Sequence, residues 1–189
     1  MTSVEGRAGS EQAGPEDAAP ARDRQTVTAE GQPVRPQIAG VVIKLLRPIE
    51  DERGDVCEMF NPAWGVSEAP LVYVYQIRIR PGKIKGWVVH YEQEDRLFVS
   101  RGAVRFALYD DRADSPTRGL VNVFVQSDRT AALVVIPRGV YHALHNVGEA
   151  EATFINMPTA PYNHANPDKY RLPLKNDLIP FSFEETSGW

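Results

Sequence analysis

The chain has 189 residues, 42% of them hydrophobic and 9% aromatic, which is enough for one globular domain with a sizeable core. The formal net charge is −4 and no run of Lys or Arg is longer than two residues, which argues against non-specific binding to nucleic acid. No stretch approaches the roughly 18 apolar residues that span a bilayer, so we expect no membrane association.

Two features of the sequence favour the cytoplasm. The N-terminus lacks the apolar segment typical of a secretory signal. The single cysteine, Cys57, cannot form a disulfide within the chain, so nothing points to an oxidising compartment. We interpret Cys57 as a small buried apolar side chain.

Residues 1–36 differ in composition from the rest of the chain. They contain no Leu, Ile or aromatic residue, and they are rich in Ala, Gly, Glu, Gln and Ser, with four prolines. Such a segment cannot bury enough apolar surface to offset the entropy lost on ordering, so we predict a disordered N-terminal tail. The folded domain is predicted to be residues 37–189.

From Ile38 onward, short β-branched and alternating runs separated by turn residues predict strands. No window has a convincing helical period longer than about two turns. An all-β fold is therefore expected, a double-sheet jelly-roll barrel of the cupin kind, with residues 158–189 as a mostly irregular C-terminal tail. The predicted strands are residues 38–47, 55–60, 71–80, 85–90, 97–100, 103–109, 120–126, 131–136, 141–146 and 152–157.

The first chemical motif surrounds His90. Residues two apart on a strand share a face, so Val88 and His90 are predicted to point into the same space. The stretch resembles the first cupin motif, which reads Gly, five residues, His-x-His, three or four residues, an acid, six residues, Gly. Gly82, Val88, His90, Asp95 and Gly102 occupy its positions, with Val88 in place of the first histidine.

The second cupin motif, Pro-x-Gly-x-x-His-x-x-x-Asn, is matched in full further along the chain, by Pro137, Gly139, His142 and Asn146. The two motifs of a cupin contribute side chains to one barrel interior, so we predict that His90 and His142 share a cavity. In metal-binding cupins such residues hold a divalent ion. A metal held by His90, Asp95 and His142 is therefore one alternative.

Beyond these motifs, the sequence resembles the dTDP-4-dehydrorhamnose 3,5-epimerase family of the cupin superfamily, as a divergent member. The resemblance covers residues 38–183, and the loop that reads Asp-x-Arg-x-x-Ser-Pro-Thr, within residues 110–119, is its most distinctive part. The other matching stretches are Asp51-Glu-Arg-Gly54 with Glu58 and Phe60, Gly86-Trp-Val-Val-His90, Ile136-Pro-Arg-Gly-Val-Tyr-His142, Pro158-Thr-Ala-Pro-Tyr-Asn163 and Tyr170-Arg-Leu-Pro173.

The resemblance implies a site without metal or cofactor that binds a nucleoside-diphosphate 4-keto-6-deoxy sugar and removes and returns protons next to the ketone. This chemistry needs a base with a pKa near the working pH, an acid on the opposite face, and cations for the enolate oxygen and the diphosphate. By the resemblance, Tyr162 is the general acid. The expected substrate contacts are Arg53 and Glu58, acting across a homodimer interface, together with Gln76, Lys85, Arg96 and His142.

The sequence departs from the family at the residues that move protons. The family's catalytic histidine falls on Val88, which cannot carry a proton, and the place of its enolate-stabilising lysine holds Asp95. The family also places an Asp behind its histidine, from a C-terminal segment for which this sequence offers no evident counterpart.

His90 shares the face of Val88, about 6.6 Å further along the strand, so we predict His90 as a displaced base. Three functions follow as alternatives. The first is a sugar-nucleotide epimerase or isomerase of deoxysugar or polysaccharide synthesis that uses His90 and Tyr162. The second is a non-catalytic cupin that binds a nucleotide sugar, and the third is a metal-dependent cupin.

Overall fold

The computed structural model describes residues 22, 24–29 and 34–183. The chain divides into two units, Met1–Pro36 and Gln37–Trp189. Within the first unit, the backbone amide of Val34 donates to the carbonyl of Thr26 at 3.1 Å. Most of the predicted disordered tail, residues 1–36, lies outside the described residues.

In its described part, the second unit consists of strands joined by turns, with one short 3-10 helix, Pro62–Trp64. No helix among the described residues is long and apolar enough to cross a membrane. The all-β prediction is confirmed, although several strands are shorter than predicted. The strands are β1 (Val42–Leu45), β2 (Ile49–Asp51), β3 (Gly54–Val56), β4 (Tyr75–Ile79), β5 (Ile84–Val89), β6 (Asp95–Arg101), β7 (Ala103–Asp110), β8 (Val121–Ser127), β9 (Ala132–Ile136), β10 (Val140–Asn146), β11 (Ala152–Asn156) and β12 (Tyr170–Arg171).

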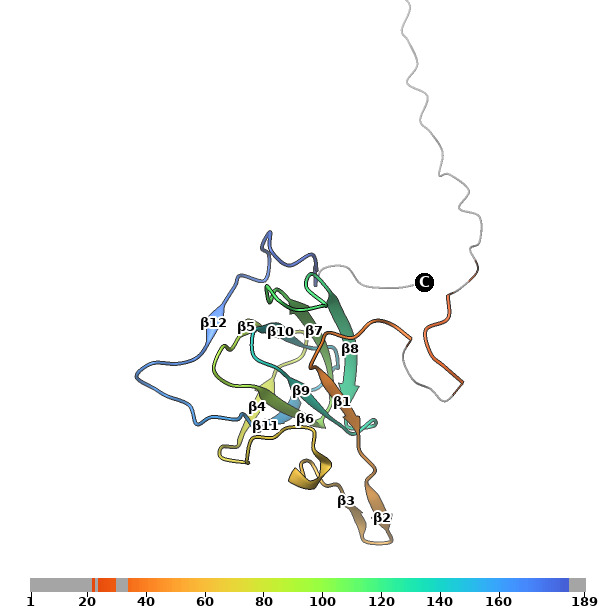
Figure 1. The fold of residues 1–189 in the computed structure, drawn as a ribbon. Helices are drawn as coiled ribbons and strands as arrows, with labels where there is room; N and C mark the ends of the chain where they lie inside the picture. The colour runs from red at the N-terminus through yellow and green to blue at the C-terminus, as the bar shows by residue number, and fades with distance from the viewer. Residues whose placement is uncertain (1–21, 23, 30–33, 184–189) are drawn as a thin grey trace, which may run out of the picture. The chain divides into compact units, whose positions relative to one another are not determined.

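Two five-stranded antiparallel sheets make up the barrel (Figure 1). One has the strand order β1-β9-β6-β11-β4 and the other β12-β5-β10-β7-β8. The motif around His90 starts in β5 of the second sheet and continues into β6 of the first, so it crosses between the sheets. The second motif lies on β10, next to β5. This topology brings the two motifs together.

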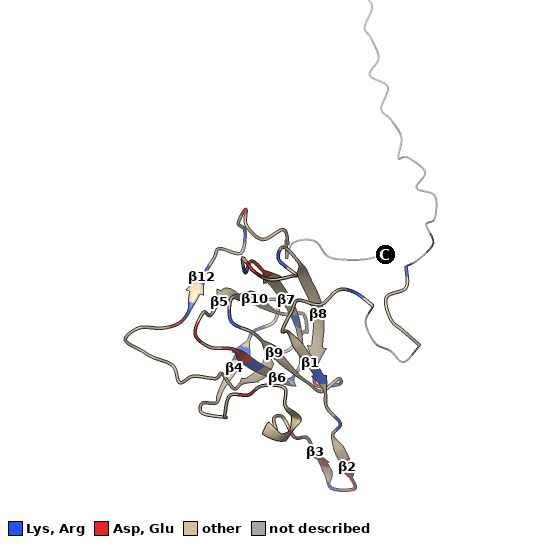
Figure 2. Ribbon diagram, in the orientation of Figure 1, with Lys and Arg blue, Asp and Glu red and all other residues tan. Residues whose placement is uncertain are grey.

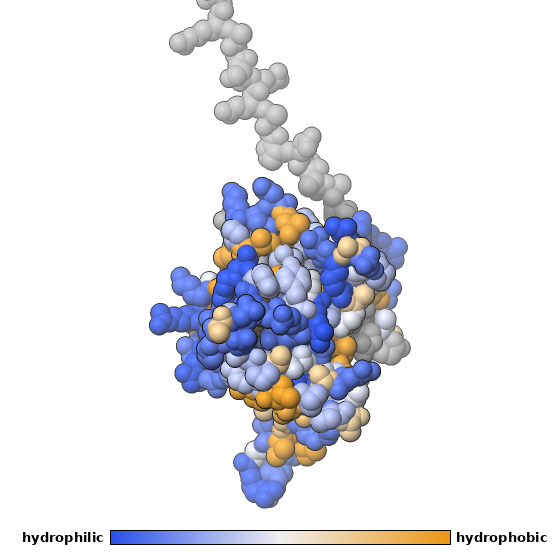
Figure 3. Space-filling model, turned by 60° about the vertical axis from the view of Figure 1, so that its left-hand side comes forward, coloured by the Kyte–Doolittle hydropathy of each residue, from blue (hydrophilic) through white to orange (hydrophobic). Residues whose placement is uncertain are grey.

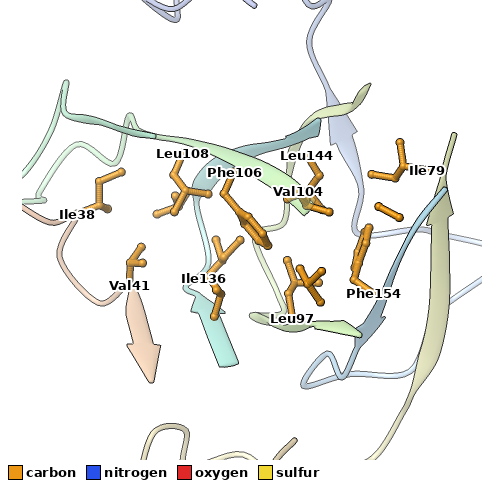
Figure 4. Packing of buried hydrophobic residues seen from close by; sticks show 14 residues of the cluster. Ile38, Val41, Ile79, Leu97, Val104, Phe106, Leu108, Ile136, Leu144 and Phe154 are labelled. Atoms are coloured by element: carbon orange, nitrogen blue, oxygen red, sulfur yellow. The ribbon is translucent and has the colours of Figure 1, made fainter. Parts of the chain in front are cut away.

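The apolar core fills the space between the two sheets and includes residues of both motif stretches, among them Leu97 and Leu144. Figure 4 shows Phe106 and Leu108 of β7 facing Leu97 and Ile136 of the opposite sheet. All four side chains are less than 3% exposed. Alternation along β7 and β9 produces this layer, because every second side chain of a strand points to the same face.

The C-terminal segment is mostly irregular over its described residues, 158–183, as predicted. Two of its residues form β12, in which Tyr170 pairs with Val89 and Arg171 with Val88 at the edge of the second sheet. Beyond β12, the chain covers the outer face of this sheet, where Ile179 is buried. The segment therefore adds a strand beside β5, at the edge of the predicted site.

A two-stranded hairpin, β2–β3, projects from the barrel below β1 (Figure 1). All six of its strand residues are exposed, and Ile49 and Val56 are 77% and 70% exposed. The turn is closed by Asp51, whose Oδ1 accepts the backbone N–H of Arg53 at 2.8 Å. A hairpin with exposed apolar residues and no layer against it is incompletely packed within one copy of this chain.

Candidate active site

Two histidines and one carboxylate meet between the sheets. His90 follows the end of β5, Asp95 begins β6 and His142 lies in β10. The Nε2 atoms of His90 and His142 lie 3.5 and 3.3 Å from Asp95 Oδ2, and the two imidazole ring centres are 5.5 Å apart. All three side chains are buried. The structure thus brings the two predicted motifs together.

These residues line a cavity of about 370 Å³, a size suited to a small-molecule ligand. Three of its lining residues, Leu97, Leu144 and Phe154, also belong to the apolar core. Polar and apolar side chains from both sheets complete the lining. The remaining lining residues are Tyr75, Ile77, Ile84, Lys85, Gly86, Val88, His90, Asp95, His142, Asn156, Lys169 and Arg171.

Val88 lines this cavity on the same side of β5 as His90, as the alternation of the strand predicts. It is 6% exposed and is the cross-strand partner of His142. A valine can neither give nor take a proton. Of the two histidines in the described cavity wall, His90 is the one that shares a strand face with Val88.

The orientation of His90 is set by Asp168, which lies 78 residues further along the chain. The Nδ1 atom of His90 donates to the backbone carbonyl of Asp168, which leaves the lone pair of a neutral imidazole on Nε2, toward the cavity. The carboxylate of Asp168 accepts the backbone N–H groups of Tyr91, Glu92 and Gln93 at 2.9, 2.8 and 3.1 Å. The C-terminal segment therefore does supply a group behind the histidine, through a main-chain carbonyl.

Two amides hold the carboxylate of Asp95. Its Oδ1 accepts from Asn156 Nδ2 at 3.0 Å and from Gln93 Nε2 at 3.2 Å. Asn156 Nδ2 also donates to the hydroxyl oxygen of Tyr75 at 2.9 Å, so the Tyr75 O–H is free to donate elsewhere. Burial and the charge of Asp95 raise the pKa of Tyr75 to about 12, and Tyr75 stays protonated at neutral pH.

His142 is a neutral member of the cluster. Burial lowers its pKa to about 4, against the opposing effect of the nearby Asp95. Its Nδ1 lies 3.3 Å from the carbonyl of Val140. Because His142 is uncharged near pH 7, the negative charge of Asp95 remains available to the other histidine, His90.

Three cationic side chains line the cavity: Lys85 from β5, Lys169 just before β12, and Arg171 in β12. Figure 2 shows basic residues at β12, beside β5. Of these three, only Lys85 was predicted from the sequence. The alternation Lys169-Tyr170-Arg171 would place both cations on one face of a strand, but a two-residue strand between prolines gives too short a pattern to find.

Tyr162 lies in the loop after β11, 41% exposed. It lines a smaller hollow of about 50 Å³ next to the main cavity, rather than the main cavity itself. Its ring packs edge-on against His164 with 4.9 Å between the ring centres. Tyr75, His90 and Lys169 line both hollows, so Tyr162 reaches the site only through this shared wall.

Two predicted substrate contacts, Gln76 and Arg96, do not line the cavity, and the alternation of their strands explains both results. Gln76 of β4 is exposed on the face opposite Tyr75. Arg96 follows Asp95 and points to the other side of β6, where it is fully buried. Its guanidinium donates to four backbone carbonyls and lies over the ring of Phe60, so Arg96 is a structural residue.

Arg53 and Glu58, the contacts predicted to act across a dimer interface, also lie away from the cavity of their own chain. Arg53 is at the tip of the β2–β3 hairpin, paired with Asp51 at 2.5 Å and with its side chain 82% exposed. Glu58 follows the hairpin, is exposed, and accepts from Asn61 Nδ2 at 3.4 Å.

The model of the dTDP-4-dehydrorhamnose 3,5-epimerase family matches residues 35–177, which include every strand of the barrel and the whole cavity. The chain belongs to this family. Membership favours an epimerase that acts on a sugar nucleotide over a binding module or a metal-dependent cupin.

Two relatives of the family are similar over most of this chain. A probable low-salt glycan biosynthesis epimerase, Agl13 of Haloferax volcanii, is 32% identical over 139 residues, which are 73% of this chain and 89% of Agl13. The spore coat polysaccharide biosynthesis protein SpsL of Bacillus subtilis is 33% identical over 149 residues, 77% of this chain and 96% of SpsL. Both names refer to polysaccharide or glycan synthesis.

The family fold is also found in solved structures. A dTDP sugar isomerase from Desulfovibrio desulfuricans superposes with a TM-score of 0.73 and 24% identity, covering 79% of this chain and 94% of the other. At this identity the comparison establishes the fold alone, and it confirms the predicted cupin barrel.

The most distinctive family stretch, the Asp-x-Arg-x-x-Ser-Pro-Thr loop, is a closed hydrogen-bond network away from the cavity. Buried Asp110 accepts from Arg112 Nε at 2.8 Å and from the hydroxyls of Ser115 and Thr117. Burial opposes ionisation of Asp110, but these hydrogen bonds outweigh it and hold its pKa well below the usual range. Arg112 also donates to the carbonyl of Ala39, so the loop fixes the chain before β1.

The cluster of His90, Asp95 and His142 would also suit a divalent metal, the alternative predicted from the sequence. Its three ligand atoms all lie within 4.8 Å of one another. Two ligands bound at about 2.1 Å to one tetrahedral ion are about 3.4 Å apart, close to the 3.3 and 3.5 Å found here. A bound ion would act as a Lewis acid, and it would occupy the Nε2 lone pair of His90.

Proposed function

We propose that the protein epimerises a dTDP-4-keto-6-deoxy sugar by removing and returning a proton next to the keto group. The family of the chain and its relatives in glycan and spore coat polysaccharide synthesis support this substrate class and a role in polysaccharide synthesis. The observation that carries the proposal is the geometry of His90. Its Nδ1 is held by the Asp168 carbonyl and its Nε2 faces the cavity beside Asp95.

In this proposal His90 is the base. The hydrogen bond from Nδ1 leaves the lone pair on Nε2, where it can take the acidic proton next to a ketone. The imidazolium that forms lies 3.5 Å from the carboxylate of Asp95, which stabilises the new charge. Proton transfer of this kind needs no cofactor.

Tyr162 returns a proton to the opposite face of the sugar ring. Its position in a hollow that shares a wall with the cavity supports this role, because base and acid must approach the enolate from different sides. Lys85 and Arg171 supply positive charge at the main cavity, suited to a diphosphate.

We also propose a homodimer in which Arg53 and Glu58 contact the nucleotide in the cavity of the partner subunit. Neither residue reaches its own cavity, and the hairpin that carries Arg53 exposes Ile49 and Val56. Figure 3 shows apolar side chains gathered toward the lower end of the domain, where the hairpin lies. A second copy packed against this surface would bury them.

A cytoplasmic location completes the proposal. The single cysteine, Cys57, is free and partly buried against apolar neighbours, as expected for a protein from a reducing compartment.

The test measures exchange of the proton next to the keto group with solvent deuterium. Purified protein is incubated with dTDP-4-keto-6-deoxyglucose in D2O, and NMR records deuterium next to the ketone together with the configuration at each carbon. We expect the wild-type protein to incorporate deuterium at a carbon next to the keto group and to invert the configuration of that carbon. His90→Ala should lower the rate on the order of a hundred- to ten-thousandfold. Tyr162→Phe should still exchange deuterium but lose inversion, because the base can return a proton to the same face.

His145→Gln is the matched control, since His145 lies on β10 but lines a different pocket. It should keep wild-type activity. If wild type binds dTDP but exchanges no deuterium, the protein is a binding module and the proposal fails.

A further inference from the structure

We propose that Lys169 is a catalytic residue of this site, whose ammonium stabilises the enolate oxygen formed when His90 removes the proton. The inference rests on the proposed function. It adds Lys169, which was predicted neither from the family motifs nor from the spacing of residues along the strands. An enolate needs a cation or hydrogen-bond donors aimed at its oxygen, and such groups are among the largest contributions to catalysis.

The need for such a residue follows from the place of Arg96. Arg96 was the cation expected beside Asp95, but its guanidinium is buried on the far side of β6 among backbone carbonyls. The cavity must take its positive charge from elsewhere. Lys85, Lys169 and Arg171 are the cations that line it in the described chain.

Among these three, Lys169 has the central position. Lys85 and Arg171 line the main cavity only, whereas Lys169 lines both the main cavity and the hollow that contains Tyr162. His90 is also common to both hollows. A sugar whose reacting carbon lies between His90 and Tyr162 would therefore place its keto group at the shared wall, within reach of Lys169.

The backbone of Lys169 is fixed on both sides. The preceding residue, Asp168, is held through three main-chain amides and through His90. The following residue, Tyr170, pairs with Val89 in the β12–β5 ladder. A cation whose main chain is anchored in this way is positioned before the substrate arrives, so little reorganisation is needed during the reaction.

The charge of Lys169 is available to a ligand. Within the part of the chain that the structure describes, no carboxylate oxygen lies within 4 Å of its ammonium. Much of the Lys169 side chain is exposed, but partial burial of its ammonium lowers its pKa. The charges of Arg171 and Lys85 lower the pKa further, and the charge of Asp95 opposes them. An anion bound among these three cations would relieve their mutual repulsion.

The experiment separates catalysis from binding. Lys169→Met removes the charge and keeps a side chain of similar length, and Lys175→Met makes the same change at an exposed lysine of the same segment outside this cavity. With dTDP-4-keto-6-deoxyglucose, we expect Lys169→Met to lower kcat for deuterium exchange about a hundred- to a thousandfold. Its Kd for dTDP should stay within about threefold of wild type, because dTDP lacks the keto sugar. Lys175→Met should change neither value.

Arg171→Gln should show the opposite pattern, which is the one expected of a phosphate contact. Its binding of dTDP should be weaker, and its loss of kcat should be smaller than that of Lys169→Met. Ethylammonium added to Lys169→Ala should recover part of the lost rate, which a purely structural role would not allow. Thermal unfolding of each variant confirms that it is folded.

Three outcomes overturn the inference. If wild type turns over and Lys169→Met keeps its kcat, Lys169 has no catalytic role and only this inference fails. If Lys169→Met loses dTDP binding as Arg171→Gln does, Lys169 is a phosphate contact. If wild type itself neither exchanges deuterium nor inverts the sugar, the proposed function and the inference fail together.

Discussion

Val88 and His142 are direct cross-strand partners on β5 and β10, so the residue that replaces the first cupin histidine lies beside the histidine of the second motif. Both side chains line the same cavity. The backbone at position 88 therefore still directs its side chain into the site. The side chain at position 88 differs in its chemistry, and His90, the proposed base, is the histidine nearest to it along the strand.

Val88→His should restore a base to a chain that has lost His90. We expect the double variant, His90→Ala with Val88→His, to exchange deuterium at least about tenfold faster than His90→Ala alone, because position 88 faces the same cavity. Burial of the larger ring should cost about 1–3 kcal/mol of the free energy of unfolding. Deuterium exchange measures the rate. Val88→Gln in the same background adds bulk without a base and should regain nothing, and recovery with glutamine would contradict this explanation.

Asp110→Asn should destabilise the barrel without touching the cavity. It leaves the guanidinium of Arg112 without its buried charged partner, which should lower the free energy of unfolding by about 3 kcal/mol near pH 7. Asp114→Asn, an exposed change in the same loop, is the control.

The effect of Asp110 should also depend on pH. Its pKa is lowered in the folded state, so its contribution is present above the unfolded value of about 3.9 and is lost as pH falls through the folded value. Denaturant unfolding from pH 7 to pH 3 should show the difference between wild type and Asp110→Asn shrinking below about pH 4. A constant difference over this range would mean that Asp110 is not ionised in the folded protein.

Metal content distinguishes the two uses of His90. If Nε2 is the base, protein purified without nickel resin or chelator should contain far less than one metal ion per chain, and its epimerisation should survive dialysis against a chelator. Elemental analysis and the exchange assay measure both. One ion per chain with loss of activity on chelation would assign His90, Asp95 and His142 as ligands and rule out His90 as the base.

Mixed dimers test whether Arg53 acts in the partner's site. Arg53→Ala and His90→Ala are each expected to be nearly inactive alone. When equal amounts are unfolded together and refolded, about a quarter of the wild-type activity should return, since half of the dimers are mixed and each of these has one intact site. Size-exclusion chromatography with light scattering checks the dimer. No recovery from a confirmed mixed dimer would place Arg53 outside the partner's site.

Strand alternation accounts for much of what the sequence could predict. It placed Val88 and His90 in one cavity wall, and the two motif spacings brought in Asp95 and His142. The same rule, applied to β6, would have turned Arg96 away from the cavity, because it follows Asp95 directly.

Other parts of the site depend on contacts between distant segments, which local patterns do not encode. Lys169 and Arg171 reach the cavity because β12 pairs with β5, and the pairing involves only two residues. Asp168 orients His90 through its backbone carbonyl, a group that every residue possesses. No residue type marks such a contact, so no motif could have predicted it.

The proposed role of His90 also makes the C-terminal segment part of the active site. The strands through β11 contain both cupin motifs and most of the core. Without residues 168–171, His90 would have no partner at Nδ1 and β5 would have no outer neighbour. A chain shortened before Asp168 is therefore expected to keep most of the residues of the barrel core but to leave its proposed base without a fixed orientation.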